Sequence, residues 1–117
     1  MTNSNRKGKR GERELAKALT ETFGVSCRRG QQYSGIEGED VVGLPGVHIE
    51  SKRTEKLSLY AAIEQAVRDA DESQVPTVFH KKNRKEWLCV VRLDDLPKLV
   101  ERLYLLMCSE GESTEQK

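Results

Sequence analysis

The chain has 117 residues and a formal net charge of +1, and 33% of its residues are charged against 36% hydrophobic. That length suffices for one small domain, and no apolar run approaches the roughly 20 residues of a transmembrane helix. The N-terminus is polar from the start, so we expect no signal peptide and a soluble, intracellular protein. The three cysteines form no C-x-x-C pair, which argues against a zinc knuckle or a disulfide framework.

The predicted elements alternate between helix and strand. Residues 8–23 place apolar side chains at helical spacing, and Gly24 follows as a natural stop for that helix. Later segments rich in β-branched residues, bounded by glycine, proline or basic turns, predict short strands. In chain order we expect a helix over 8–23, strands over 25–29, 40–43 and 47–53, a helix over 57–70, strands over 75–80 and 86–91, and a helix over 93–107.

This order predicts an α/β fold with a central mixed β-sheet of about five strands flanked by helices. The early hairpins imply antiparallel pairs, and the second helix can serve as a crossover that brings the following strand in parallel. We expect residues 1–117 to form a single domain, with disordered tails at 1–5 and 109–117.

The strand expected over 47–53, VHIESKR, has charged side chains on one face. Because side chains alternate along a strand, His48, Glu50 and Lys52 point the same way. One interpretation is a solvated strand face whose ion pair contributes little to stability. The other interpretation is a functional site, in which His48 lies near a metal or is a bystander.

Asp40 favours the functional interpretation, because a hairpin over GLPG would fold it back towards Glu50. Two converging carboxylates repel each other, and one would take up a proton unless a cation lies between them. Magnesium prefers such hard oxygen ligands, so Asp40 and Glu50 are its expected ligands. Lys52 would lie beside the metal, where it can position a water or neutralise charge on a phosphate.

Glu12 is a third candidate acid. It lies at the start of the apolar stripe of the first helix and so points towards the sheet, whereas Glu14 is rotated by roughly 200° and should face water. The alternative for Glu12 is that the first helical turn still projects into solvent and favours acids through the helix dipole.

Basic residues gather at three points of this nearly neutral chain, in RKGKRGER, CRRG and HKKNRK. Such clusters suggest a local patch for a polyanion such as nucleic acid, although solvated surface residues are the plain alternative. The expected phosphate contacts from the first and third clusters are Arg6, Lys7, Lys9, Arg10, Lys81, Lys82 and Arg84.

The spacing of Asp40 and the run Glu50, Ser51, Lys52 resembles the active-site motif of the PD-(D/E)XK nuclease superfamily. The stretch RKGKRGERELAKAL is similar to the opening of archaeal-type Holliday junction resolvases and their phage and prophage relatives. DVVGLPGVHIESKR, LSLYAAIEQA and PTVFHKKNRKEWL look similar to the phage and prophage members in particular. The resemblance covers residues 6–93, approximately.

The resemblance implies a restriction-endonuclease-like fold and a role for each matching residue. Glu12 matches a helix acid that helps order the attacking water or the metal, and Gln65 matches a glutamine beside the site. Glu39 stands where the motif has a proline, which is often missing in the superfamily. The implied sets are Asp40, Glu50, Ser51 (through its carbonyl) and Glu12 for the metal; Glu12, Asp40, Glu50, Lys52 and Gln65 for catalysis; and Arg28, Arg29 and Arg53, with the basic clusters, for DNA.

The resemblance further implies a Mg²⁺-dependent endonuclease, with Mn²⁺ able to substitute, that hydrolyses DNA phosphodiesters. It implies a Holliday junction resolvase that cuts four-way junctions as a homodimer, as a phage or prophage protein in a bacterial cytoplasm or nucleoid, with no membrane partner. A nuclease of the same superfamily acting on flaps, single strands or duplex ends stays open. A DNA-binding module without activity is disfavoured, because the acids and the lysine are all present.

Overall fold

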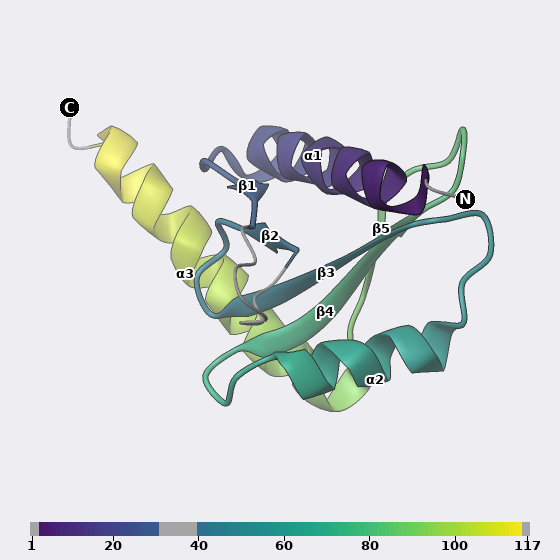
Figure 1. Ribbon diagram of the computed structural model, residues 1–117. Helices are drawn as coiled ribbons and strands as arrows, with labels where there is room; N and C mark the ends of the chain where they lie inside the picture. Colours follow the sequence, from purple (N-terminus) through teal and green to yellow (C-terminus); the bar gives the residue numbers. More distant parts are fainter. Residues whose placement is uncertain (1–2, 31–39, 116–117) are drawn as a thin grey trace.

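The computed structural model of the chain describes residues 3–30 and 40–115, and the side chains of residues 8–30 and 40–109 (Figure 1). The elements follow the predicted order of helix, three strands, helix, two strands and helix. Their bounds are α1 Asn3–Phe23, β1 Arg28–Arg29, β2 Val41–Val42, β3 Val47–Arg53, α2 Leu59–Asp69, β4 Val75–Lys81, β5 Leu88–Val90, the 3₁₀ helix η1 Leu93–Asp95 and α3 Leu96–Glu115.

Some element boundaries differ from the sequence pattern. The strands β1, β2 and β5 contain only two or three residues each, because the chain leaves the sheet as soon as the hairpin pairs end. The helices α1 and α3 reach into the terminal segments for which the sequence predicts disorder, and that disorder stays a prediction. Among the residues that the structure describes, no helix is both long and apolar enough to cross a bilayer.

The five strands form one mixed sheet in the order β1-β2-β3-β4-β5. The pairs β1–β2, β2–β3 and β4–β5 are antiparallel, whereas β3 and β4 run parallel. The helix α2 makes the crossover between the two parallel strands, as predicted. The parallel pair is the longest in the sheet, since its register continues from Val47 opposite Val75 to Arg53 opposite Lys81. The central strand β3 is therefore held on both sides.

Helices cover both faces of this sheet, with α1 and α2 on opposite sides of β3 and β4 (Figure 1). Apolar residues of α2 pack on Val78 of β4 and form a small second core. The larger core joins α1 and α3 to the other face of the sheet. Its buried members are Leu15, Ala16, Leu19, Val41, Leu44, Val47, Ile49, Val75, Phe79 and Leu99.

The helix α1 comes very close to β3 at Gly11. A Cβ atom built on Gly11 would lie 2.6 Å from the Cβ atom of Arg53, closer than side-chain carbons approach each other. Glycine is therefore required where the helix meets the end of the strand. This close packing brings the next residue, Glu12, down to the sheet.

Candidate active site

Asp40, the residue just before β2, stands opposite Glu50 of β3. Val41 of β2 pairs with Ile49 of β3, so the same antiparallel register sets Asp40 across from Glu50. The Asp40 N–H donates a hydrogen bond to the Ile49 carbonyl at 2.9 Å, and the Ser51 N–H donates to Oδ2 of Asp40 at 2.8 Å. The hairpin thus brings the two carboxylates together, as the sequence predicts.

The electrostatics of Asp40 reflect this crowding. Burial, followed by repulsion from Glu50, raises the pKa of Asp40 to about 7 from its ordinary value of 3.8. The Glu12 carboxylate also raises this pKa, whereas the Ser51 N–H and the Lys52 ammonium lower it. The site therefore carries more negative charge than its own cations balance, which a divalent cation would relieve.

Lys52 lies next to this pair of acids, and a residue of α2 accepts a hydrogen bond from its ammonium group. The Nζ atom of Lys52 donates a hydrogen bond of 2.9 Å to Oε1 of Gln65. The structure therefore brings together two residues that are 13 positions apart in sequence. The helical pattern of residues 57–70 had given no reason to expect Gln65 at the site; the resemblance alone indicated it.

Glu12 reaches the site from α1, as its place on the apolar stripe predicts. Its side chain is 19% exposed, and its Oε1 accepts a hydrogen bond of 2.8 Å from Nε of Arg29. Arg29 on β1 is therefore engaged with this candidate acid and shields part of its charge. The neighbouring Arg28 is exposed.

His48 and Glu50 are buried beneath α2, so the interpretation of a solvated strand face is wrong. Glu50 is 2% exposed and His48 is fully buried. Nε2 of His48 lies 2.8 Å from Oε1 of Glu50. Asp69, the last residue of α2, completes a group of three whose ligand atoms lie within 4.8 Å of one another. Glu50 belongs both to this group and to the pair of carboxylates that it forms with Asp40, so the two sites adjoin each other.

The oxygen-rich donor set fits a hard divalent cation. Two carboxylates whose repulsion already raises a pKa are typical ligands of Mg²⁺ or Mn²⁺, with a backbone carbonyl and waters filling the remaining positions. Asp40 and Glu50 are the residues that would hold such an ion. The Ser51 carbonyl stays a predicted ligand, and its amide is tied to Asp40.

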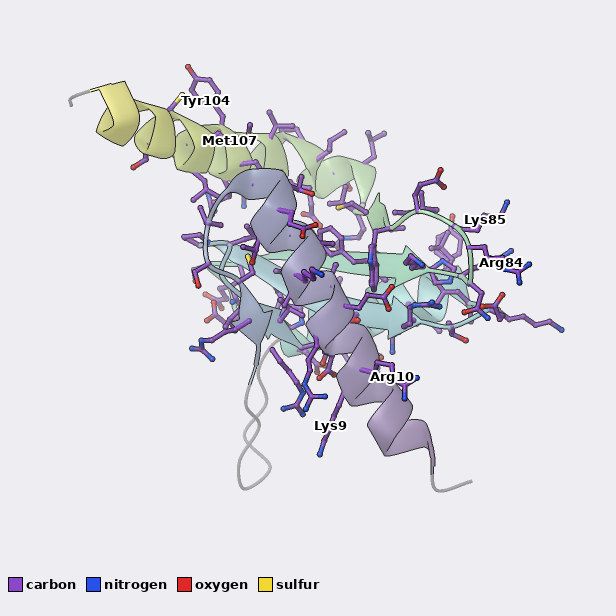
Figure 2. The ribbon with its side chains drawn as sticks, turned by 90° about the horizontal axis from the view of Figure 1, so that it is seen from above. Lys9, Arg10, Arg84, Lys85, Tyr104 and Met107 are labelled. Carbon is purple, nitrogen blue, oxygen red and sulfur yellow. The ribbon has the colours of Figure 1, made fainter. Side chains whose placement is uncertain are left out.

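The predicted DNA-contacting residues divide into two groups. Arg53 and Lys81 are tied to Glu14 of α1, at 3.0 Å and 3.5 Å. Glu14, which the helical pattern predicts to face water, is 37% exposed and also pairs with these two cations. In contrast, Figure 2 shows the side chains of Lys9, Arg10, Arg84 and Lys85 reaching outward from the start of α1 and from the β4–β5 connection. These side chains are exposed, as is Lys82. Arg6 and Lys7 lie outside the part of the chain whose side chains are described.

Sequence reasoning gave no role to Asp69 and left His48 open. A strand face shared with Glu50 was the one signal for His48. No signal exists for Asp69, because its proximity depends on where α2 ends relative to β3. Residues 31–39 lie outside the part of the chain that the structure describes, so the motif position that Glu39 occupies is known from the sequence alone.

Comparison with known proteins identifies the relatives of this chain. Residues 3–112 match the profile of a family described as phage putative PDDEXK endonuclease. No curated protein matches, and no solved structure matches. The profile covers nearly the whole chain, and the five-stranded mixed sheet between helices has the restriction-endonuclease-like architecture expected of it. Such a family implies a nuclease that acts on DNA with a divalent metal. The chain belongs to the phage family of PD-(D/E)XK endonucleases.

Proposed function

We propose that this family member hydrolyses DNA phosphodiesters with Mg²⁺, replaceable by Mn²⁺, and that its substrate is a four-way junction cut by a homodimer. One observation supports the proposed hydrolysis: the side chains of Asp40, Glu50 and Lys52 lie close together beside β3. Their proximity goes with a pKa of Asp40 raised to about 7. An acid pair this strained in the absence of a cation, beside a lysine, suits phosphodiester hydrolysis.

Each side chain has a distinct role in this proposal. Asp40 and Glu50 hold the cation together with the Ser51 carbonyl; when bound, it polarises the scissile phosphate and stabilises negative charge. Lys52 orients the attacking water and neutralises charge on a phosphate oxygen, and Gln65 fixes the Lys52 ammonium in place. Glu12 helps to order the water and is itself oriented by Arg29.

Binding of DNA is assigned to the exposed basic residues. Lys9 and Arg10 on α1 and Lys82 and Arg84 after β4 are exposed, and Figure 2 shows Lys9, Arg10 and Arg84 reaching outward. Contacts of this kind hold the phosphate backbone without reading sequence, which suits recognition of a branched shape. Arg28 and Arg29 would extend the contact on the β1 side of the acids.

An apolar stripe on α3 supports the homodimer. Leu99 faces the larger core, but Leu96, Val100, Tyr104 and Met107 remain 39% to 65% exposed. These four residues recur at helical spacing, and Figure 2 shows Tyr104 on the outer side of α3.

The stripe is large enough to matter for association. Together with Leu93, which is 80% exposed, these residues expose on the order of 600 Å² in total, at the upper end of the apolar patches that monomers leave uncovered. A stable interface buries about 800 Å² per partner. Two copies related by a twofold axis would cover one stripe with the other, and a twofold dimer matches the two symmetric strands of a four-way junction.

A cleavage assay tests this proposal. A labelled four-way junction, a flap, a single strand and a linear duplex are incubated with Mg²⁺ and wild-type protein, Lys52→Ala or Lys17→Ala. Lys17 is an exposed lysine of α1 and serves as the matched control. Paired symmetric nicks in the junction alone, lost in Lys52→Ala and kept in Lys17→Ala, are the expected result.

Two other outcomes lead elsewhere. Cleavage of flaps, single strands or duplex ends in preference to junctions would keep the chemistry and refute junction resolution. Salt-sensitive binding without cleavage of any substrate would refute the nuclease assignment and favour a DNA-binding module.

A further inference from the structure

His48 lies directly beneath the carboxylate of Glu50, and both side chains are withdrawn from water. Nε2 of His48 is 2.8 Å from Oε1 of Glu50, and the two side chains are 0% and 3% exposed. We propose that His48 is a positioning residue that fixes the Glu50 carboxylate for metal binding, with Asp69 as the second carboxylate beside its ring. This inference rests on the proposed function, because it assigns Glu50 to the metal.

The bond from His48 decides which oxygen of Glu50 remains available. A glutamate side chain has three rotatable bonds, and a buried one with no anchor could turn either oxygen towards Asp40. Because Oε1 lies against His48, Oε2 is the less occupied atom for a cation shared with Asp40. Hydrogen bonds to ligating carboxylates are a general means of orienting metal ligands, and their loss typically weakens metal binding by 10–100-fold.

The backbone of His48 is anchored as firmly as its ring. The buried hydroxyl of Thr77 on β4 donates a hydrogen bond of 2.8 Å to the His48 carbonyl. The register places His48 beside Pro76 in the parallel pair, so the chain cannot shift here without breaking the centre of the sheet. The imidazole is therefore held at a fixed height below Glu50.

A second acidic group lies near the His48 ring. Asp69 belongs to the same group of ligand atoms within 4.8 Å of one another as His48 and Glu50. An imidazole that contacts a ligand carboxylate and lies near a second carboxylate is in an environment that favours an N–H donor towards the ligand. A purely space-filling role would need neither carboxylate, and an apolar side chain would serve it as well.

Metal binding measured directly on the full-length protein tests this inference. Mn²⁺ is titrated without DNA, and free Mn²⁺ is followed by electron paramagnetic resonance. We expect His48→Leu, which removes the N–H donor, to weaken Mn²⁺ binding by 10–100-fold. His48→Gln, which keeps an N–H donor of similar reach, should stay within a few-fold of wild type.

The chain offers a matched control in its other histidine. Nε2 of His80 lies 2.8 Å from the Thr54 carbonyl and contacts no candidate ligand in the described structure. His80→Leu should therefore leave Mn²⁺ binding unchanged. If His48→Leu does not fold, His48→Asn replaces it, because its amide is too short to reach Glu50 and the same weakening is expected.

The outcomes separate this inference from the proposed function. Wild-type affinity for Mn²⁺ in His48→Leu, or equal weakening in His48→Gln and His48→Leu, would overturn the positioning role. Asp40→Asn removes a proposed ligand, so it should bind Mn²⁺ weakly whether or not His48 matters. If Asp40→Asn binds as wild type does, the metal site itself is misassigned and the proposed function fails with it.

Discussion

Replacing Asp40 with asparagine is expected to stabilise the metal-free protein and to abolish cleavage. Burial and then repulsion from Glu50 raise the pKa of Asp40 from 3.8 to about 7. A shift of about three units corresponds to about 4 kcal/mol, the free energy that ionising Asp40 takes from the folded protein when no cation is bound. Asparagine carries no charge and keeps an oxygen to accept the Ser51 N–H, so the variant avoids this loss.

The gain in the free energy of unfolding of Asp40→Asn over wild type should increase with pH. Between about pH 4 and pH 7 the folded protein holds a proton on Asp40 that the unfolded chain has released, so the wild-type free energy of unfolding falls as pH rises. Above about pH 7 Asp40 is ionised in both states, so the wild-type free energy of unfolding falls no further from this group. Asp40→Asn should therefore match wild type near pH 4 and exceed it by about 2–4 kcal/mol near pH 8.

Urea unfolding in the presence of a chelator, followed by the fluorescence of Trp87, measures this difference at both pH values. The matched control is Glu64→Gln, which neutralises an exposed acid of α2 and should change little. A gain of equal size at both pH values, or a variant less stable than wild type near pH 8, would refute the reasoning. Added Mn²⁺ should raise the stability of wild type much more than that of Asp40→Asn, which binds the ion weakly.

Three further outcomes can be checked in the same way. Gly11→Ala would force a methyl group against the Cβ atom of Arg53 and should lower the free energy of unfolding by about 1–3 kcal/mol; an unchanged urea midpoint would contradict the close packing. Removing both exposed cations in Lys82→Ala/Arg84→Ala should reduce the slope of log Kd against log salt for junction DNA by about two, measured by fluorescence anisotropy; an unchanged slope would exclude both contacts. Tyr104→Glu places a charge in the apolar stripe and should yield monomers in light scattering; a dimer of wild-type stability would place the interface elsewhere.

The backbone frame of the site was predictable from the sequence. A short GLPG turn leaves few registers for the β2–β3 hairpin, so Asp40 had to come near Glu50. Helical spacing likewise put Glu12 on the side of α1 that packs on the sheet. In both cases the information is local, because a turn length or a helical period fixes it.

Contacts that depend on how elements cross were not predictable. Glu14 lies away from the apolar stripe, yet Arg53 and Lys81 reach it from the ends of two parallel strands. His48 is buried because α2 packs on that face of β3. Strand alternation predicts which side chains share a face, but not whether a helix packs on it. Gln65 could be placed only through the resemblance, because its contact with Lys52 depends on the rotation of α2 over the sheet.

The position of β3 between β2 and β4 has a consequence for the protein's synthesis. Every proposed catalytic side chain lies between Glu12 and Gln65, so all of them have been translated before β4 begins at Val75. Without β4 as its parallel neighbour, β3 is an edge strand, and Glu50 lacks its neighbour Val78 on that side. Parallel pairing across a helix is a long-range contact that forms late in folding. A ribosome-bound chain therefore carries the proposed catalytic residues before the sheet that positions them is complete, so we expect activity only once β4 has joined the sheet.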